Sequence, residues 1–276
     1  MIIALTITAL ALLIGLRVKK HINDKPMAQT DTTVIAKRVL NLIILDESGS
    51  MRGLERVSVD GVNETIQAIK GAYEQLPGQE QLITFITFSS TRDSDYRTQL
   101  ELAPISKVKE INESDYIPRG GTPLYDTMGK ALTELERTAT DSDIVLVTII
   151  TDGKENSSLE YNQEMIKTLI NRLDEKDWVF TYIGANQDAV EVARRMNIDN
   201  AMNFQATQED TRRMWDDYKD STSAYYEKVR MSKMRGERVF EDKEFFCKNM
   251  HTERVTPERI TSRILEIHQI ITFYKW

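Results

Sequence analysis

The sequence contains few of the residues that enzymes use as nucleophiles, general bases or zinc ligands. A single cysteine, Cys247, occurs among 276 residues, so no disulfide can form within the chain, and such scarcity is typical of a reducing compartment. The three histidines, His21, His251 and His268, show no spacing of zinc ligands. Nucleotide-binding glycine loops of the G-x-G-x-x-G and Walker A types are absent, as is a G-x-S-x-G nucleophile elbow. We therefore expect a protein that is not an enzyme.

An excess of positive charge is also missing. Lysine and arginine number 36 against 43 aspartates and glutamates, which gives a net charge of −7. This balance excludes the general electrostatic footprint of a nucleic-acid-binding protein. Hydrophobic residues make up 41% of the chain, enough for a core, and the length suits one α/β domain with extensions or two small domains.

Only the N-terminus carries a long apolar run. Residues 2–16 would span ~22 Å as a helix, short of the ~30 Å hydrocarbon core of a bilayer. The basic residues Arg17, Lys19 and Lys20 follow this run, unlike those of a signal peptide, and would keep the remainder of the chain in the cytoplasm. Two interpretations stay open: a short inner-membrane anchor within residues 1–20, or a true start at Met27. Both leave the main domain cytoplasmic.

From about residue 34, apolar strand-like runs alternate with helical patterns. This alternation predicts an α/β fold with a doubly wound, mostly parallel six-stranded sheet and helices on both faces. The expected strands cover residues 39–45, 82–88, 96–102, 144–150, 178–183 and 201–204. The third follows the second through a tight polar turn, so we expect it to be an antiparallel edge strand.

The helical patterns predict which side chains face the core. Three-four spacing places Tyr73 on the inner face of a first helix and Met165 on that of a helix over residues 160–173. A covering helix over residues 208–229 is expected to bury one face, formed by Trp215, Tyr218, Thr222, Tyr225 and Val229. Residues 228–238 are locally basic and are interpreted as a solvated linker.

Three regions follow from this reading: an apolar segment and linker over residues 1–33, a main domain over residues 34–230, and a helical C-terminal extension over residues 231–276. In the extension, Thr256 and Pro257 form a good helix start. An apolar stripe follows at Ile260, Ile264, Ile267, Ile271 and Tyr274. We expect the stripe to dock on the domain; pairing with a second chain or binding in a partner's groove are the alternatives.

Oxygen-bearing side chains gather where two buried strands end. The first expected strand stops at Asp46, and the hydroxyls of Ser48 and Ser50 follow at alternate positions. The fourth strand ends just before Asp152, and a third hydroxyl, Thr122, stands at a helix entry after two glycines. Open α/β sheets place ligands at the carboxyl ends of their strands. A set made only of oxygen atoms suits a hard divalent cation such as Mg²⁺.

These three pieces, Asp-x-Ser-x-Ser, Gly-Gly-Thr and Thr-Asp-Gly, occur in an order that resembles the metal-ion-dependent adhesion site (MIDAS) of the von Willebrand factor A (VWA) family. The resemblance covers residues 37–205. It implies that Ser48, Ser50 and Thr122 bind Mg²⁺ or Mn²⁺ directly, and that Asp46 and Asp152 act through bridging waters. Neutral hydroxyls leave the cation under-neutralised, so that an Asp or Glu of a protein partner can complete its octahedron.

Further residues of these motifs carry expectations of their own. Glu47 and Glu155 are expected on the rim of the site, and Asp126 is expected to support the Thr122 loop. Close backbone approach and positive φ angles are expected at three glycines: Gly49, Gly121 and Gly153.

The resemblance favours a metal-dependent adaptor module. Residues 151–156 and 178–186 are similar to pieces of the intracellular bacterial, tellurite-resistance-associated (TerY-type) group, which implies a stress-response or defence system. The family also implies an AAA+ ATPase as a partner. One alternative is a Mg²⁺-dependent phosphohydrolase with Asp46 as nucleophile, but Ser48 stands where haloacid dehalogenases need a second aspartate. Another is a membrane-tethered scaffold that depends on residues 1–20.

Overall fold

The computed structural model describes residues 38–76, 78–90, 96–185, 189–235 and 243–246. The apolar N-terminal run, Cys247, the three histidines and the isoleucine stripe lie outside these residues, so the expectations for them stay predictions.

A six-stranded sheet forms the centre of the described chain, with strand order β3-β2-β1-β4-β5-β6. Its strands are β1 (Arg38–Asp46), β2 (Glu80–Phe88), β3 (Tyr96–Pro104), β4 (Ile144–Thr151), β5 (Val179–Ala185) and β6 (Asn200–Phe204). Only β3 runs antiparallel, and it lies at one edge beside β2. The fold class and the six strands predicted from the sequence are confirmed.

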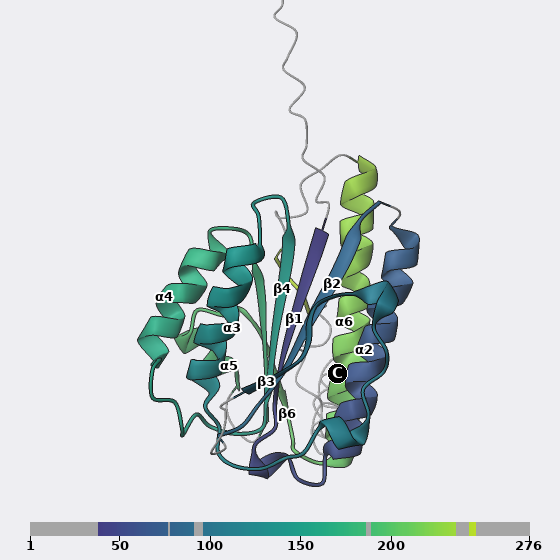
Figure 1. The fold of residues 1–276 in the computed structure, drawn as a ribbon. Helices are drawn as coiled ribbons and strands as arrows, with labels where there is room; N and C mark the ends of the chain where they lie inside the picture. The colour runs from purple at the N-terminus through teal and green to yellow at the C-terminus, as the bar shows by residue number, and fades with distance from the viewer. Residues whose placement is uncertain (1–37, 77, 91–95, 186–188, 236–242, 247–276) are drawn as a thin grey trace, which may run out of the picture. The chain divides into compact units, whose positions relative to one another are not determined.

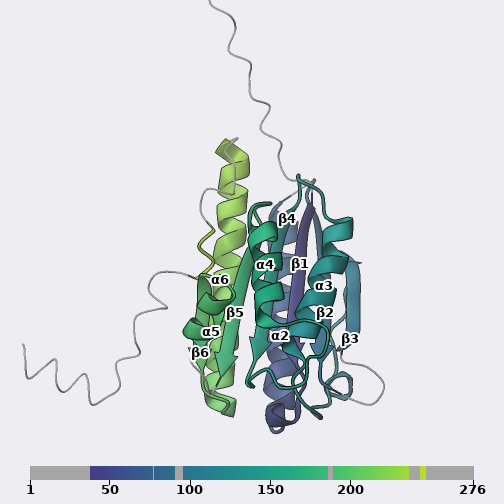
Figure 2. The same ribbon diagram turned by 90° about the vertical axis from the view of Figure 1, so that its left-hand side faces the viewer.

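Helices cover both faces of this sheet (Figures 1 and 2). On one face lie α2 (Glu55–Gln75) and α6 (Gln208–Arg235), and on the other lie α3 (Leu124–Thr138), α4 (Gln163–Asp174) and α5 (Ala189–Arg195). Each face has its own buried cluster, because side chains alternate along β1: Ile43 and Leu45 face α2 and α6, whereas Leu42 and Ile44 face the other layer.

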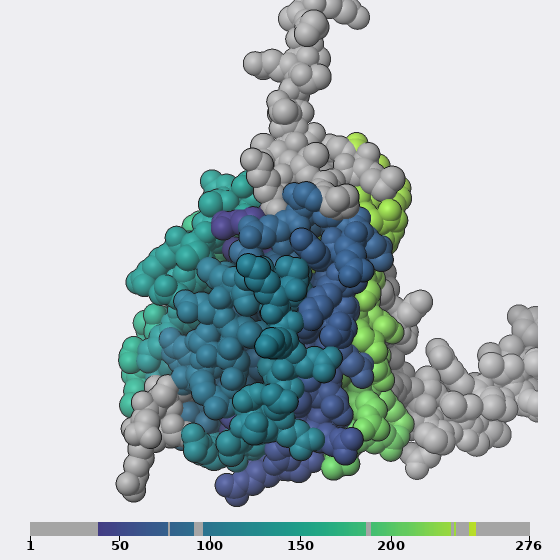
Figure 3. Space-filling view, turned by 45° about the vertical axis from the view of Figure 1, so that its right-hand side comes forward, coloured from purple at the N-terminus to yellow at the C-terminus, as the bar shows by residue number. Residues whose placement is uncertain are grey.

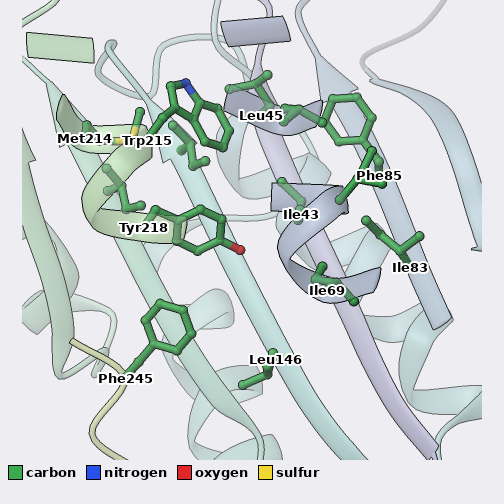
Figure 4. Close-up of a cluster of buried hydrophobic side chains, with 14 of the residues drawn as sticks. Ile43, Leu45, Ile69, Ile83, Phe85, Leu146, Met214, Trp215, Tyr218 and Phe245 are labelled. Carbon is green, nitrogen blue, oxygen red and sulfur yellow. The ribbon is translucent and has the colours of Figure 1, made fainter. Parts of the chain in front are cut away.

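The covering helix α6 packs along α2 and onto the sheet (Figure 3). Its Trp215 and Tyr218 project toward β1 and β4 in Figure 4, and the whole predicted face is buried. Two buried phenols also bond to the sheet: Tyr218 donates to Thr148 Oγ1 at 2.9 Å, and Tyr226 donates to Asn41 Oδ1 at 2.8 Å. These bonds satisfy polar groups that would otherwise be costly in the core.

The structure corrects three packing expectations. Tyr73 and Met165 were predicted to be buried, but they are 37% and 46% exposed. In α4 the buried stripe instead includes Ile166 and Ile170, one position further along the helix than Met165. The basic stretch interpreted as a solvated linker is helical as far as Arg235, where α6 ends.

Part of the C-terminal extension belongs to the core. Phe245 and Phe246 are buried at 4% and 1% exposure, and Phe245 lies 5.7 Å from Tyr218 between ring centroids. The Phe245 N–H donates to Asn200 Oδ1 at 2.9 Å, which ties this segment to the edge strand β6.

Among the described residues, no helix is both long and apolar enough to cross a membrane.

Candidate functional site

Two central strands end in acidic loops at the same edge of the sheet. Asp46 is the last residue of β1, and Thr151 is the last residue of the adjacent parallel strand β4, so Asp152 follows directly. The parallel register places the two carboxyl ends side by side, at the lower edge in Figure 1. Because the bulk of β1 and β4 is buried on both faces, only these ends are free to present polar side chains.

Asp46 is fully buried and hydrogen-bonded at both oxygens. Its Oδ1 accepts the backbone N–H of Ser48 at 2.7 Å, and its Oδ2 accepts the Thr151 hydroxyl at 2.5 Å. Burial nevertheless raises the pKa of Asp46 to about 6, because desolvation outweighs these bonds. Asp46 is therefore a buried carboxyl group with no neighbouring cation among the described residues.

The second carboxylate is linked to the serine pair. The Ser48 and Ser50 hydroxyl oxygens lie 3.0 Å apart, and Ser50 Oγ donates to Asp152 Oδ1 at 2.6 Å. Asp152 Oδ2 is buried and has no hydrogen-bond partner in the structure. Burial also raises the pKa of Asp152. An unpartnered carboxylate oxygen beside two hydroxyls is the arrangement that a cation or a cation-bound water would satisfy.

Thr122 approaches the same place from the opposite loop. A Cβ built on Gly153 would lie 3.0 Å from Thr122 Oγ1, 3.6 Å from Ser50 Oγ and 3.7 Å from Asp46 Oδ2. Oxygens from two separate segments, the loop after β1 and the Thr122 loop, thus lie near one point beside Gly153, and any larger residue there would crowd them. The structure brings together all five residues singled out from the sequence: Asp46, Ser48, Ser50, Thr122 and Asp152.

A backbone clip holds the Thr122 loop against the loop after β1. Gly120 has a φ of +71°, and a Cβ there would lie only 2.0 Å from Ser90 O. The Gly49 N–H donates to Gly120 O at 3.0 Å, and the Ser90 N–H donates to Gly121 O at 3.0 Å.

The expectation of positive φ at Gly49, Gly121 and Gly153 is wrong. Among the described residues, the glycines with positive φ at this edge of the sheet are Gly53 and Gly120.

The two glutamates expected on the rim bind the backbone of neighbouring loops instead. Glu47 is 6% exposed; its Oε1 accepts the Ile117 N–H at 2.5 Å and forms an ion pair with Arg97 at 2.9 Å. The Glu155 carboxylate accepts backbone N–H groups of Tyr125 and Ser158, at 2.9 and 2.7 Å. Both acids satisfy loop donors that would otherwise be buried without partners, so they shape the loops rather than face a ligand.

Asp126 supports a different loop from the one predicted. Its carboxylate accepts three consecutive backbone N–H groups, those of Leu159, Glu160 and Tyr161, at 2.7 to 2.9 Å. Although burial raises the pKa of Asp126, these donors hold it below its ordinary value. The side chain therefore fixes the segment that follows Asp152, on the other side of the site from Ser48.

Sequence reasoning overlooked three supporting residues. Thr151 donates to Asp46, and Tyr116 donates its phenol proton to Asp46 O at 2.5 Å. Asn156 Oδ1 accepts the Thr122 N–H at 2.8 Å. Thr151 and Asn156 stand within the quoted Thr-Asp-Gly motif and its extension, which was the available signal. Nothing local in the sequence marks Tyr116, because it reaches Asp46 only through the tertiary fold.

The ligand set has a definite chemical character. It contains two carboxylates and three hydroxyls, and no group of three or more His, Cys, Asp or Glu side chains able to hold a metal occurs in the described part of the chain. The five candidate ligands are all oxygen atoms of the kind that Mg²⁺ prefers, and this set contains no nitrogen or sulfur ligand of the zinc type.

Sequence comparison decides the family. The model of the von Willebrand factor type A domain matches residues 42–215, which is more than half of the chain. The chain belongs to the von Willebrand factor A family. The matched range of this VWA domain begins inside β1, ends inside α6 and includes every residue of the site. No curated protein sequence matches the chain significantly.

Solved structures match parts of this chain at low identity. The pilus adhesin SpaC from Lactobacillus rhamnosus GG, in its open conformation, has a TM-score of 0.52 at 14% identity over 69% of this chain and 30% of the adhesin. A von Willebrand factor type A protein from Catenulispora acidiphila has a TM-score of 0.40 at 19% identity, with 66% and 42% covered. The SpRpn10 VWA domain has a TM-score of 0.45 at 12% identity, with 63% and 92% covered. This chain thus spans less than a third of the length of SpaC.

Proposed function

We propose that this VWA domain is a protein-binding module whose site holds Mg²⁺ or Mn²⁺ and captures an acidic side chain of a partner. One observation carries the proposal: the oxygens of Asp46, Ser50 and Thr122 surround a point beside Gly153, close to a buried oxygen of Asp152 that has no partner. This donor set fits a small hard cation. The common role of VWA domains as binding or adhesion modules supports it.

The residues have separate tasks in this proposal. Ser48, Ser50 and Thr122 would hold the ion through their hydroxyls, and Asp46 and Asp152 would hold it through water. When bound, the ion supplies a Lewis acid with an open position for a carboxylate oxygen. Asp46 must release its proton for this, and because burial raises its pKa to about 6, the site binds the ion more weakly below that pH.

The surroundings of the site keep it in shape before a ligand arrives. Asp46 accepts two hydrogen bonds that fix its carboxylate plane, and Asn156 fixes the backbone of Thr122. Ser50 is exposed, whereas Ser48 and Thr122 are 2% exposed, so a ligand reaches the site from the side of Ser50. A preformed and one-sided opening favours the capture of a single projecting side chain over the binding of an extended substrate.

A hydrolytic role has less support. Asp46 is 0% exposed and both of its carboxylate oxygens already accept hydrogen bonds, so neither oxygen is presented to a substrate as a nucleophile would be. Position 48 carries a hydroxyl where haloacid dehalogenases need a general acid. VWA domains are usually non-catalytic, which favours a module that binds.

We also propose the cellular setting. The likeness of residues 151–156 and 178–186 to the TerY-type group supports a bacterial stress-response or defence system, with an AAA+ ATPase as a partner of the kind that VWA proteins often have. A cytoplasmic domain, tethered to the inner membrane by residues 1–20 in one interpretation, is consistent with the scarcity of cysteine. The alternative is a membrane-tethered scaffold, which the apolar run at residues 2–16 supports.

Titration of the full chain with Mn²⁺, followed by calorimetry and by electron paramagnetic resonance, tests the metal claim. We expect weak binding to the wild type and none to Asp46→Ala or Ser50→Ala. Asp199→Ala, which removes an exposed acid far from the site, should bind like the wild type. Strong Zn²⁺ binding with no response to Mg²⁺ or Mn²⁺ would contradict the proposal.

A further inference from the structure

Five exposed side chains stand on the three loops that carry or lead into the site residues: the loop after β1, the loop before Thr122 and the loop after Asp152. They are Arg52, Ile117, Arg119, Lys154 and Leu159, here called the rim. We propose that the rim is the docking surface for an acidic protein segment that carries an aliphatic residue beside the carboxylate bound at the metal. This inference rests on the proposed function and specifies the partner of the same site.

The three cations of the rim lie next to residues of the site, either along the chain or through hydrogen bonds between the loops. Lys154 follows Gly153, the residue at the point where the oxygens converge. Arg119 precedes Gly120, whose carbonyl accepts the Gly49 N–H at 3.0 Å. Arg52 lies two residues after Ser50, and its Nε donates to Pro118 O at 3.4 Å, which places it beside the Arg119 loop.

These three cations have no internal counter-charge. None of them forms an ion pair with any described residue, although the chain as a whole carries a net charge of −7. Exposed acids of the same edge do have partners: Glu160 pairs with Lys130, Glu113 lies 4.0 Å from Arg56, and Glu55 accepts the Gly53 N–H. The three cations of the rim are therefore available to the acids of a partner, whose approach to the site they would favour.

Two large apolar side chains complete the rim. Leu159 is 92% exposed and Ile117 is 51% exposed, a costly placement for aliphatic side chains on a rigid surface. Their backbones are held firmly: the Leu159 N–H donates to Asp126 Oδ2 at 2.7 Å, and the Ile117 N–H donates to Glu47 Oε1 at 2.5 Å. The fold thus presents both side chains outward, one on the β4 side of the site and one on the β1 side.

Together the rim and the site define the chemistry of the occupant. A carboxylate is needed at the metal, further acids meet the three cations, and an aliphatic side chain removes Leu159 from water. A neutral or basic partner would leave the cations unmatched, and a purely acidic one would leave Leu159 exposed. The acidic–aliphatic segment is the occupant that satisfies all three features.

Synthetic peptides of designed composition test this assignment against the full chain by fluorescence anisotropy. Four sets carry acids with leucine, acids with serine, amides with leucine, and lysines with leucine, each in Mg²⁺ and in EDTA. We expect only the acid–leucine set to bind well, and only in Mg²⁺. Leu159→Ser should weaken it about tenfold, a typical cost of one lost aliphatic contact, and should abolish the preference for leucine.

Matched controls separate the rim from general surface effects. Met165→Ser removes another exposed apolar side chain, in the first turn of α4 and outside the rim, and Lys107→Glu reverses an exposed charge near the opposite edge of the sheet. Neither should change peptide binding. The double variant Arg119→Glu, Lys154→Glu should slow association and remove most of its salt dependence.

The possible results distinguish failure of the rim assignment from failure of the proposed metal-dependent function. If acid–serine peptides bind in Mg²⁺ as tightly as acid–leucine peptides, and Leu159→Ser behaves like Met165→Ser, the rim is not the docking surface although the metal site stands. If peptides bind equally in Mg²⁺ and EDTA, or none binds in Mg²⁺, the proposed function itself is contradicted, and the rim assignment with it.

Discussion

Replacing Asp46 by Asn should stabilise the metal-free protein at neutral pH. The Asp46 carboxyl has an ordinary pKa of 3.8 and a pKa of about 6 in the fold, mainly because it is buried. Since the folded state holds this proton more tightly than the unfolded chain, its contribution favours folding at low pH. That contribution is lost as the pH rises from 3.8 to about 6. Holding the carboxylate ionised at pH 7.5 therefore costs about 3 kcal/mol of folding free energy.

Asn can occupy the place of Asp46 with its hydrogen bonds rearranged. Its Oδ1 can still accept the Ser48 N–H, and its amide can donate to Thr151 Oγ1 once the Thr151 hydroxyl donates to Gly153 O, which lies 3.1 Å away. We expect Asp46→Asn to gain about 1–3 kcal/mol over the wild type at pH 7.5 in EDTA, and to show no gain at pH 3.5. Added Mg²⁺ at 100 times its Kd should stabilise the wild type alone by about 2.7 kcal/mol, which offsets most or all of this difference.

Urea denaturation in EDTA at the two pH values, repeated with saturating Mg²⁺ at pH 7.5, measures this. The comparison of wild type with variant cancels the titration of other acids, such as Asp126. Asp199→Asn serves as the control, since that acid is exposed and lies far from the site. The reasoning is refuted if Asp46→Asn is less stable than the wild type at pH 7.5 in EDTA, or if Mg²⁺ stabilises both proteins equally.

Three further changes separate the site from the scaffold. Ile44→Asp buries an unpaired charge in β1, where Ile44 is 0% exposed, and should abolish the cooperative thermal transition; a normal melt would show that the central strand is misplaced. Gly120→Ala puts a Cβ 2.0 Å from Ser90 O at a φ of +71° and should cost about 1–3 kcal/mol. It should also weaken Mn²⁺ binding in calorimetry, and unchanged affinity would exclude the Gly120 clip from the site. Phe246→Ala empties a 1% exposed position and should cost about 3–5 kcal/mol in urea denaturation, with Mn²⁺ affinity retained; a cost below 1 kcal/mol would show that the segment does not belong to the core.

The strands, and the convergence of the candidate site residues at one edge of the sheet, could be predicted from sequence because both depend on short-range patterns. Runs such as residues 39–45 are apolar on both faces, which only a sheet covered on both sides accommodates. Asp46, Ser48 and Ser50 lie at fixed intervals from the end of such a run, so their common edge follows from the parallel order of β1 and β4.

Side chains that depend on the path of a loop could not be predicted in the same way. Glu47 and Glu155 look like exposed acids in the sequence, and only the fold shows that their carboxylates accept loop N–H groups. The phase of α4 was misjudged because Met165 and Ile166 are adjacent apolar residues, and periodicity alone does not choose between them. The basic stretch after residue 228 is helical because Val229 packs against the core while its charged neighbours stay in water.

The location of a bound Mn²⁺ ion tests the central claim most directly. Anomalous diffraction from crystals of the full chain soaked in Mn²⁺ should give a peak beside Gly153, within direct or water-bridged reach of Ser48, Ser50, Thr122, Asp46 and Asp152. Asp46→Ala crystals treated in the same way should lack it. A peak that lies elsewhere, or one that persists at this point in the Asp46→Ala protein, would contradict the account.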